Sequence, residues 1–330
     1  MGATTTIAFP IELPVVKRGE HWIARAQDRE LKLSNLDKVY WPDEGYTKGD
    51  LLSYYFNISL TMLPHLVDRP LTLKRMPDGI KGDFFYEKNA PSYTPKWMPR
   101  IPVRSESENK TIQFLSVADV SHMLWLANLG CIEFHPLHGR GTNQRCPSYA
   151  FFDLDPFEPA GYTEVKHVAN LVKLLLDKLG LESYPKTSGA TGMQIMVPLD
   201  GTTDYDHVRG FVGAVSDLSH AADPETTTLE WEVKKRPGKV FLDVNMNREG
   251  ANIAAAYSLR PEPGATASAP FEWDELVDIH PSRFTIETMF DRVAQVGDPF
   301  LPVAESPGQS LAEAIAAVDA KPRKARVINR

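Results

Sequence analysis

The chain has 330 residues, 42% of them hydrophobic, and a formal net charge of −7. This suffices for one large domain or two closely packed subdomains, and the acidic balance does not exclude a local basic face that binds nucleic acid. The two cysteines, Cys131 and Cys146, exclude a disulfide framework and a four-ligand zinc site built from them alone, which favours a reducing cytoplasm. The N-terminus lacks a signal-peptide pattern and no stretch approaches about 18 apolar residues, so we expect no membrane association.

The first third of the chain is expected to begin with a peripheral arm, residues 1–30. A helix is then predicted from Thr47, because its side chain can cap a helix start together with Asp50 in a capping-box arrangement. Residues 70–88 alternate like two strands around a turn at Pro77–Gly79.

The middle of the chain alternates helices with strands. A helix is predicted over Asp119–Leu129 and a strand over residues 131–137. Residues 148–155 predict an aromatic-rich strand that ends in acid. A second helix is predicted over Thr163–Leu179, where an apolar stripe runs along one face and Gly180 can end it.

The last part begins with a strand, a glycine turn and a strand over residues 181–199, followed by a helix over His207–His220. Residues 231–247 predict a hairpin whose turn lies at Pro237–Gly238. The stretch after residue 300 is rich in Ala, Pro, Lys and Arg, and it ends in the basic sequence KPRKARVINR. Helices interspersed with tightly connected strands indicate a mixed α/β fold with antiparallel pairing.

The sharpest chemical signal is the pair Asp153 and Asp155 at the end of the aromatic strand. Residues two apart on a strand face the same side, and two adjacent carboxylates repel each other unless a cation such as Mg²⁺ or Mn²⁺ lies between them. Asp243 also ends an apolar run, so three carboxylates on two neighbouring strands suit a two-metal site for phosphoryl transfer. The alternative is a strand end with solvated aspartates.

A glycine turn follows the acids in the sequence. Gly189 and Gly192 let the backbone approach a phosphate closely, and the amides and hydroxyls of Ser188 and Thr191 can donate to its oxygens. The alternative for this motif is a plain β-turn.

Several motifs in order resemble the polymerase domain of bacterial DNA ligase D, in the archaeo-eukaryotic primase superfamily. They are RPLTLKRMPDG, FFYEK, FFDLDP, YPKTSGATGMQIMVPL, GKVFLDVNMN and AAAYSLRPEPG. The resemblance covers roughly residues 30–290 and implies a primase-polymerase fold with a mostly antiparallel central sheet flanked by helices. We therefore expect an arm over residues 1–30, a catalytic domain of two intimate subdomains over 31–300, and a tail over 301–330.

The resemblance implies roles for individual residues. The acids would bind two Mn²⁺ or Mg²⁺ ions. The residues implied at the nucleotide are Ser188, Gly189, Thr191, Gln194, His135, Arg236, Arg260 and Lys74, the arginines holding either the nucleotide or neighbouring acids.

The resemblance also implies a DNA-binding set. Lys38 and Lys48 would grip the 5′-phosphate on the downstream side of a gap, since paired lysines suit a group with about two charges. Phe85 and Tyr86 would stack on template bases, which tolerates any base. The alternatives are solvated surface lysines and core aromatic residues.

This chain departs from the family pattern in the glycine turn. The family usually reads Ser-Gly-x-Lys-Gly-x-His, whereas this chain has Thr191 in place of the lysine and Gln194 in place of the histidine. Neither replacement carries charge, and Lys186 is a candidate to compensate.

The leading hypothesis is a metal-dependent nucleotidyltransferase, a polymerase or primase that extends a 3′-hydroxyl at short gaps or DNA ends and prefers ribonucleotides. Its partners would be DNA with a 5′-phosphate, nucleoside triphosphates, and a Ku-type protein and a separate ligase supplied in trans, in the bacterial cytoplasm at the nucleoid. A second hypothesis is a DNA-end binding or bridging module with weak or lost catalysis, and a third is a metal-dependent phosphoesterase. The third does not explain the lysine pair or the aromatics.

Overall fold

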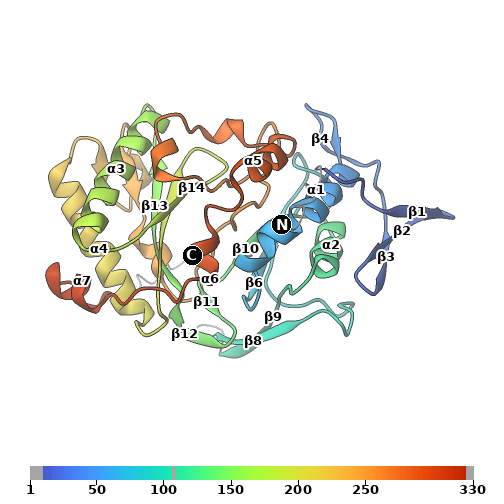
Figure 1. Cartoon of the computed structure of the whole chain (residues 1–330), viewed down its shortest axis with the longest axis horizontal. Coiled ribbons are helices and arrows are strands. Elements are labelled where there is room, and N and C mark those ends of the chain that lie inside the picture. Colours follow the sequence, from blue (N-terminus) through green and yellow to red (C-terminus); the bar gives the residue numbers. More distant parts are fainter. Residues whose placement is uncertain (1–9, 106–108, 325–330) are drawn as a thin grey trace, which may run out of the picture.

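The computed structural model describes residues 10–105 and 109–324. Two β-sheets, each with its own helices, lie side by side (Figure 1). One hydrophobic cluster runs through both halves, from Leu51 in one to Val168 in the other. None of the described helices is long and apolar enough to cross a bilayer.

The sheet that carries the acids has five strands. In sheet order they are β14 (Tyr184–Thr187), β15 (Met193–Pro198), β13 (Tyr149–Pro156), β17 (Val240–Leu242) and β16 (Thr227–Thr228). All neighbours are antiparallel except β16 and β17. Helices α3 (Tyr162–Lys178) and α4 (Tyr205–Ala222) pack against β13. The predicted mixed α/β fold with a mostly antiparallel sheet is confirmed.

The second sheet contains the strands predicted over residues 70–88. Its order is β10 (Cys131–Pro136), β6 (Leu71–Arg75), β9 (Lys110–Leu115) and β8 (Arg100–Ser105), with β7 (Phe85–Glu87) also pairing with β6. Helices α1 (Lys48–Met62) and α2 (Val120–Asn128) pack on each other beside it. The predicted capping box is confirmed: the Thr47 side chain accepts from the Asp50 amide, and the Asp50 side chain accepts from the Thr47 amide.

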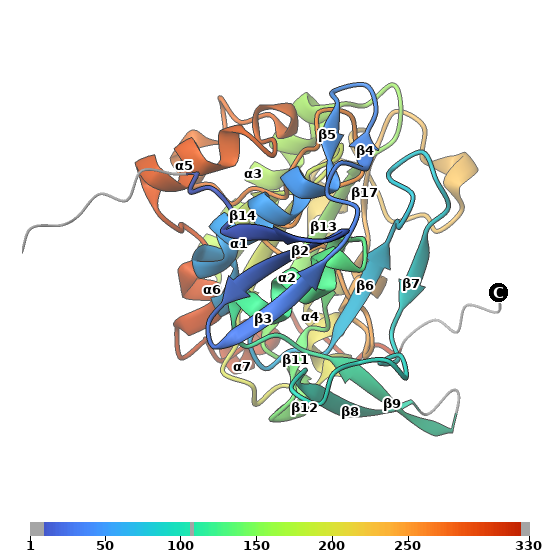
Figure 2. The ribbon, with the colours of Figure 1, turned by 90° about the vertical axis from the view of Figure 1, so that its right-hand side faces the viewer.

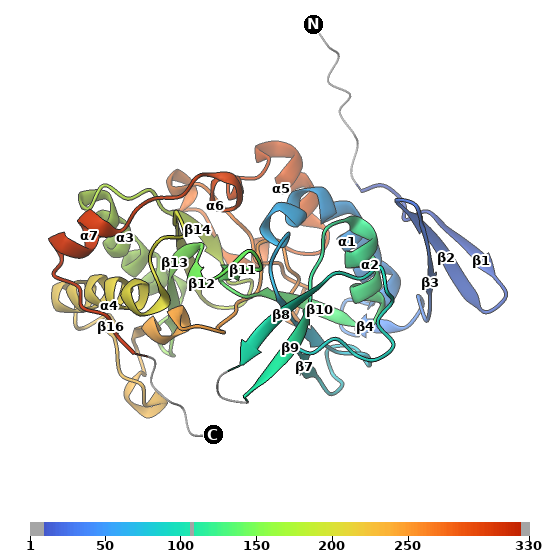
Figure 3. The same cartoon turned by 90° about the horizontal axis from the view of Figure 1, so that it is seen from below.

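Smaller elements surround these two sheets. β1 (Val15–Arg18), β2 (His21–Ala26) and β3 (Arg29–Leu33) form an antiparallel sheet that projects at one end of the molecule (Figures 1 and 3). The region predicted as an arm therefore contains regular structure. The other elements are the pairs β4 (Val39–Trp41) with β5 (Tyr46–Thr47) and β11 (Gly139–Arg140) with β12 (Asn143–Pro147), and helices α5 (Thr288–Val296), α6 (Leu301–Glu305) and α7 (Ala312–Ala317).

The hairpin predicted over residues 231–247 is wrong. Residues 233–235 form a 3₁₀ turn, and β17 takes β13 and β16 as its partners. All three residues of β17 are buried, and a strand with no solvent-facing side belongs in the interior of a sheet rather than in an exposed hairpin.

Candidate active site

The three predicted acids lie at one place on the first sheet. β13 pairs with β17 through Leu154 and Leu242, and the Asp243 amide donates to the Asp153 carbonyl over 3.2 Å. Asp243 therefore lies opposite Asp153, and Asp155 projects from the same face of β13 as Asp153. The prediction that the acids come from two neighbouring strands is confirmed.

Burial and repulsion raise the pKa of each acid. Burial, followed by the charge of Asp155, raises the pKa of Asp153 well above its ordinary value. Burial and the charge of Asp243 raise the pKa of Asp155 to about 6, and burial also raises the pKa of Asp243. Asp153 is buried, and Asp155 and Asp243 are partly buried. Hard oxygen donors with too little positive charge around them fit divalent ions such as Mg²⁺ or Mn²⁺.

Protein donors hold part of this acid set. Gln194 Nε2 donates to Asp153 Oδ1 and the Asn245 amide donates to Asp243 Oδ1, both over 3.0 Å. Within residues 10–105 and 109–324, no group of three or more His, Cys, Asp or Glu side chains is already arranged as a metal-ligand set. The three acids supply hard oxygen donors of the kind that divalent ions prefer.

Lys186, Gln194 and Asp153 form a row across three strands. Gln194 on β15 is paired with Lys186 of β14 on one side and Asp153 of β13 on the other. Lys186 is fully buried, and its ammonium donates to Gln194 Oε1, to Ser268 Oγ over 2.6 Å and to the Ala254 carbonyl over 3.1 Å. Because an ammonium can only donate, Gln194 must turn its oxygen to Lys186 and its N–H to Asp153. The row therefore fixes the orientation of the Asp153 carboxylate.

This row shows what Lys186 does in a chain that has Thr191 and Gln194 in place of the family's lysine and histidine. Burial lowers the pKa of Lys186 to about 7, and its ammonium is engaged inside the protein. Lys186 therefore does not replace the charge missing at Thr191, which is exposed at the turn. It acts instead on Asp153 through Gln194.

Part of the glycine turn is bonded within itself. The Ser188 amide, one of the predicted donors, donates to the Gly192 carbonyl over 3.0 Å, and Ser188 Oγ accepts from the amides of Ala190 (3.1 Å) and Gly192 (3.0 Å). Among the described residues, the Ser188 hydroxyl serves only as an acceptor in these two bonds, which leaves its proton to donate. Gly189 has φ +75°, and a Cβ on Gly192 would lie 3.0 Å from Asp155 Oδ1, so the turn abuts the acids.

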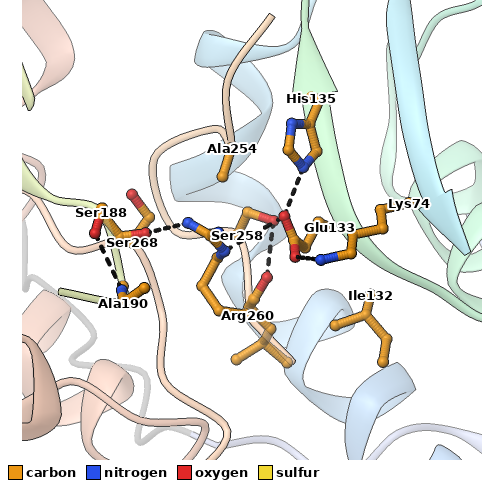
Figure 4. Close-up of polar contacts among 12 residues, drawn as sticks. Lys74, Ile132, Glu133, His135, Ser188, Ala190, Ala254, Ser258, Arg260 and Ser268 are labelled. Atoms are coloured by element: carbon orange, nitrogen blue, oxygen red, sulfur yellow. Dashed lines mark hydrogen bonds and ion pairs between the residues drawn. The ribbon is translucent and has the colours of Figure 1, made fainter. Parts of the chain in front are cut away.

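A second cluster centres on Glu133 of β10 (Figure 4). This carboxylate, 1% exposed, accepts from Lys74 over 2.8 Å and contacts His135 Nε2 over 2.6 Å and Arg260 Nε over 3.3 Å. These three partners overcome the cost of burial and lower the pKa of Glu133 to about 2. Arg260 also donates to the carbonyl of Ser188, so it joins this cluster to the glycine turn.

Arg236 lies in a pocket formed by its own loop and by aromatic rings. Its guanidinium donates to the carbonyls of Glu230 (2.8 Å) and Trp231 (2.7 Å), and its centre lies 3.5 Å from the centroid of Phe241. Its charge lowers the pKa of Asp155 against the effect of burial. Of the two predicted roles for Arg236, this geometry corresponds to the one beside the acids.

The comparisons with known proteins agree with this geometry. Residues 47–300 match the model of the LigD primase-polymerase domain. The chain belongs to this family. The multifunctional non-homologous end joining protein LigD of Mycolicibacterium smegmatis is 32% identical over 280 residues, covering 84% of this chain and 36% of that protein. The bifunctional LigD of Bacillus subtilis is 32% identical over 280 residues, covering 84% of this chain and 45% of that protein.

A solved structure shares the fold. The polymerase domain of Mycobacterium tuberculosis ligase D, in complex with DNA, matches with a TM-score of 0.79 and 30% identity, covering 84% of this chain and 98% of that one. The chain spans less than half the length of the curated LigD relatives just named.

In this LigD primase-polymerase domain the two lysines predicted at a 5′-phosphate lie together. The Lys48 amide donates to the Lys38 carbonyl over 2.8 Å at the start of α1. Lys48 is 4% exposed, and its ammonium donates to the Ser34 carbonyl (2.8 Å) and to Asn128 Oδ1 (2.9 Å). Burial, with the charge of Lys38, lowers the pKa of Lys48 to about 8. Lys48 is therefore no solvated surface lysine, whereas Lys38 is part exposed and pairs with Asp78.

The aromatic residues of β7 are exposed. Phe85 is 44% and Tyr86 is 53% exposed, which excludes the alternative that they belong to the core. Tyr86 meets the ring of His135 edge to face, with centroids 6.0 Å apart, and the Arg75 guanidinium lies 5.0 Å from the centroid of Phe85. Adjacent exposed aromatic rings are typical of a surface on which a flat, apolar group of a ligand stacks.

Sequence reasoning missed two residues that build the site. Glu133 lies two positions before His135 on one strand, so the alternation of strand side chains could have indicated it. Asn247 exchanges two hydrogen bonds with the backbone of Phe151, at 2.9 Å and 2.7 Å, and thereby holds β13 just before the acids. No local signal in the sequence marked that contact.

Proposed function

We propose that this protein is a metal-dependent nucleotidyltransferase that extends a 3′-hydroxyl at short gaps or ends of DNA in non-homologous end joining. The observation that supports this best is the juxtaposition of two clusters. Three acids with raised pKa values lie on one sheet, and the glycine turn and Arg260 join them to the cations around Glu133. Such a pair of clusters suits a triphosphate whose leaving group is held by cations.

Asp153, Asp155 and Asp243 would hold two Mg²⁺ or Mn²⁺ ions. The bound ions would lower the pKa of the attacking hydroxyl and neutralise charge on the phosphates. Lys186 and Gln194 would keep Asp153 in a fixed orientation. Lys74, His135 and Arg260 would line the nucleotide, with the Ser188 hydroxyl as a further donor.

The DNA would lie on the exposed aromatic strand. Phe85 and Tyr86 would stack on template bases next to the gap, and Lys38 with Lys48 would bind the downstream 5′-phosphate. We also infer a preference for ribonucleotides, a Ku-type protein and a separate ligase as partners, and a place in the bacterial cytoplasm at the nucleoid. Initiation and extension would use the same acids, so a primase activity belongs to the same proposal.

A DNA-end binding or bridging role is the second candidate. It is favoured by the glycine turn, because Thr191 carries no charge and two turn amides are bonded internally. Against it stands the cluster of three acids, because a purely binding protein gains nothing from carboxylates that repel each other.

The test is an extension assay on a duplex with a short gap and a 5′-phosphate, with Mn²⁺ or Mg²⁺ and each ribo- and deoxyribonucleoside triphosphate. The proposal expects labelled primers to grow by one or more nucleotides, with ribonucleotides added faster. DNA binding is measured in parallel. Binding without extension under every condition would leave only the bridging role.

A further inference from the structure

The last described stretch of the chain, residues 318–324, lies along α4. The Arg323 amide donates to the Asp206 carbonyl over 3.0 Å, and the Arg323 guanidinium pairs with Asp217 on the same helix. Figure 3 shows this red segment passing from α7 along α4. One face of one helix therefore holds the segment by both backbone and side chain.

Two glycines of α4 make room for this segment. A Cβ on Gly210 would lie 2.1 Å from the carbonyl oxygen of Lys321, and a Cβ on Gly213 would lie 2.4 Å from Arg323 Nη1. Asp206, Gly210, Gly213 and Asp217 follow helical spacing, so they form one stripe on α4. Glycine is unfavourable inside a helix, and the close approach of the chain end gives these two glycines a structural reason.

The docked segment forms one wall of a hollow that Asp243, one of the three acids, also lines. Arg323 and Lys324 line a hollow of about 220 Å³ together with Arg209, Trp231 and Asp243. Trp231 belongs to the loop whose carbonyls hold Arg236. The segment thus brings basic side chains to the edge of the proposed active site.

This feature lies outside the part of the chain that the family shares. The family model ends at residue 300, whereas the docked segment begins at residue 318. Lys321, Arg323 and Lys324 are exposed, and the Arg323–Asp217 pair is about half exposed on each side, 43% and 50%. Figures 2 and 3 place the end of this segment on the same side of the molecule as β7, β8 and β9.

We propose that residues 321–324 are a second nucleic-acid contact, a basic wall that α4 holds in place and that binds the phosphate backbone of DNA engaged at the acids. The inference rests on the proposed function, because it requires DNA at that face. Phosphate is the partner that fits, since residues 321–324 offer two lysines and one arginine. Lys321 pairs with Asp319 just before them, so Arg323 and Lys324 are the main candidates for phosphate contacts. A half-exposed ion pair is weak, so Arg323 can exchange Asp217 for a phosphate at little cost.

The test compares the salt dependence of DNA binding in the full chain and in the double variant Arg323→Ala, Lys324→Ala. Binding to a gapped duplex is followed by fluorescence anisotropy over a range of salt concentrations. Each phosphate contact contributes about −0.9 to the slope of log K against log salt, so the slope should become shallower by about 2 units. Affinity near 0.1 M salt should fall by about tenfold or more.

Two further variants test whether the position of the basic side chains matters as well as their charge. Lys17→Ala, Arg18→Ala removes an adjacent basic pair on β1, at the opposite end of the molecule, and should leave the slope unchanged. Gly210→Ala keeps every charge and favours the helix, but it displaces the backbone of Lys321. Its slope should move toward that of the Arg323→Ala, Lys324→Ala variant.

The outcomes are distinct. An unchanged slope in the Arg323→Ala, Lys324→Ala variant would overturn the proposal and leave the segment as a cover for α4 or as a contact for another protein. Tighter binding in that variant would overturn it too, because the segment would then compete with DNA. Wild-type protein that binds DNA but never extends a primer would contradict the proposed function. The salt dependence of DNA binding could still be compared between the variants in that case.

Discussion

The negative charge of two carboxylate sites in this molecule is compensated to opposite degrees. Glu133 is surrounded by Lys74, His135 and Arg260, and its pKa falls to about 2. The pKa of Asp155, beside Asp153 and Asp243, rises to about 6, although this side chain is less buried than Glu133. The protein therefore satisfies Glu133 with its own cations and leaves the acid triad short of positive charge. This difference is the main support for our proposal that the triad, unlike Glu133, binds metal cations.

The largest expected effect comes from Asp155→Asn, which removes one charge and keeps the shape of the side chain. Primer extension should fall by about 10³-fold or more, because a metal supplies several kcal/mol of transition-state stabilisation. Without added metal, the free energy of unfolding at pH 7 should rise by about 1–3 kcal/mol, since a repelling charge has gone. Extension assays and urea denaturation measure the two effects. An Asp155→Asn variant less stable than wild type would contradict the comparison.

Glu133→Gln should have the opposite effect on stability. Three cationic or polar partners would lose a buried counter-charge, so the free energy of unfolding should fall by about 3–5 kcal/mol. The folded-state pKa of Glu133 lies below its ordinary value, so its contribution is present above about pH 4.5 and is lost as the pH falls toward about 2. Urea denaturation at several pH values checks this. A variant as stable as wild type would mean that the interactions of Glu133 with Lys74, His135 and Arg260 do not stabilise the fold.

Lys186→Met tests the row that orients Asp153. The variant keeps the length of the side chain but removes the charge and the donors, so Gln194 loses the partner that fixes its amide. Metal affinity should fall by about tenfold, as for other residues that orient a metal ligand through hydrogen bonds without touching the metal. Mn²⁺ titration measures the change, and Lys178→Met, on the exposed end of α3, is the control. Equal loss in both variants would remove the role given to Lys186.

The smallest effect is expected at the lysine pair. The pKa of Lys48 is lowered to about 8, so its charge is present below that pH and is lost as the pH rises through it. The preference for DNA with a 5′-phosphate should therefore weaken by about fivefold between pH 7 and pH 9, as one charge-assisted contact is lost. Binding of matched duplexes with and without the phosphate checks this. A constant ratio would separate Lys48 from the phosphate.

The sequence predicted best what depends on neighbouring residues. The cap of α1 needs only Thr47 and Asp50, and the acid pair needs only strand alternation, so both followed from the local pattern. The primase-polymerase fold followed from motifs in order along the chain. The direction of the Gln194 and Lys186 side chains needed the register of three strands, which no single motif contains.

The predictions that failed, and the contacts that were missed, involve residues far apart in the sequence. The hairpin over residues 231–247 was wrong because β17 pairs with β13, much earlier in the sequence, rather than with the segment just before it. Glu133 meets Arg260 only in the folded chain, and Lys48 is buried by Ser34 and Asn128 from other elements. The docking of the C-terminal segment on α4 falls in the same class, because two glycines in a helix do not by themselves show what approaches them.

Metal binding by the acid triad can be measured by titration with Mn²⁺ followed by electron paramagnetic resonance. Wild-type protein should bind two ions per chain near neutral pH, and Asp155→Asn should lose at least one of them while Glu133→Gln, if folded, keeps both. Protein that binds no Mn²⁺ at millimolar concentration, or an Asp155→Asn variant that binds as wild type does, would contradict the account.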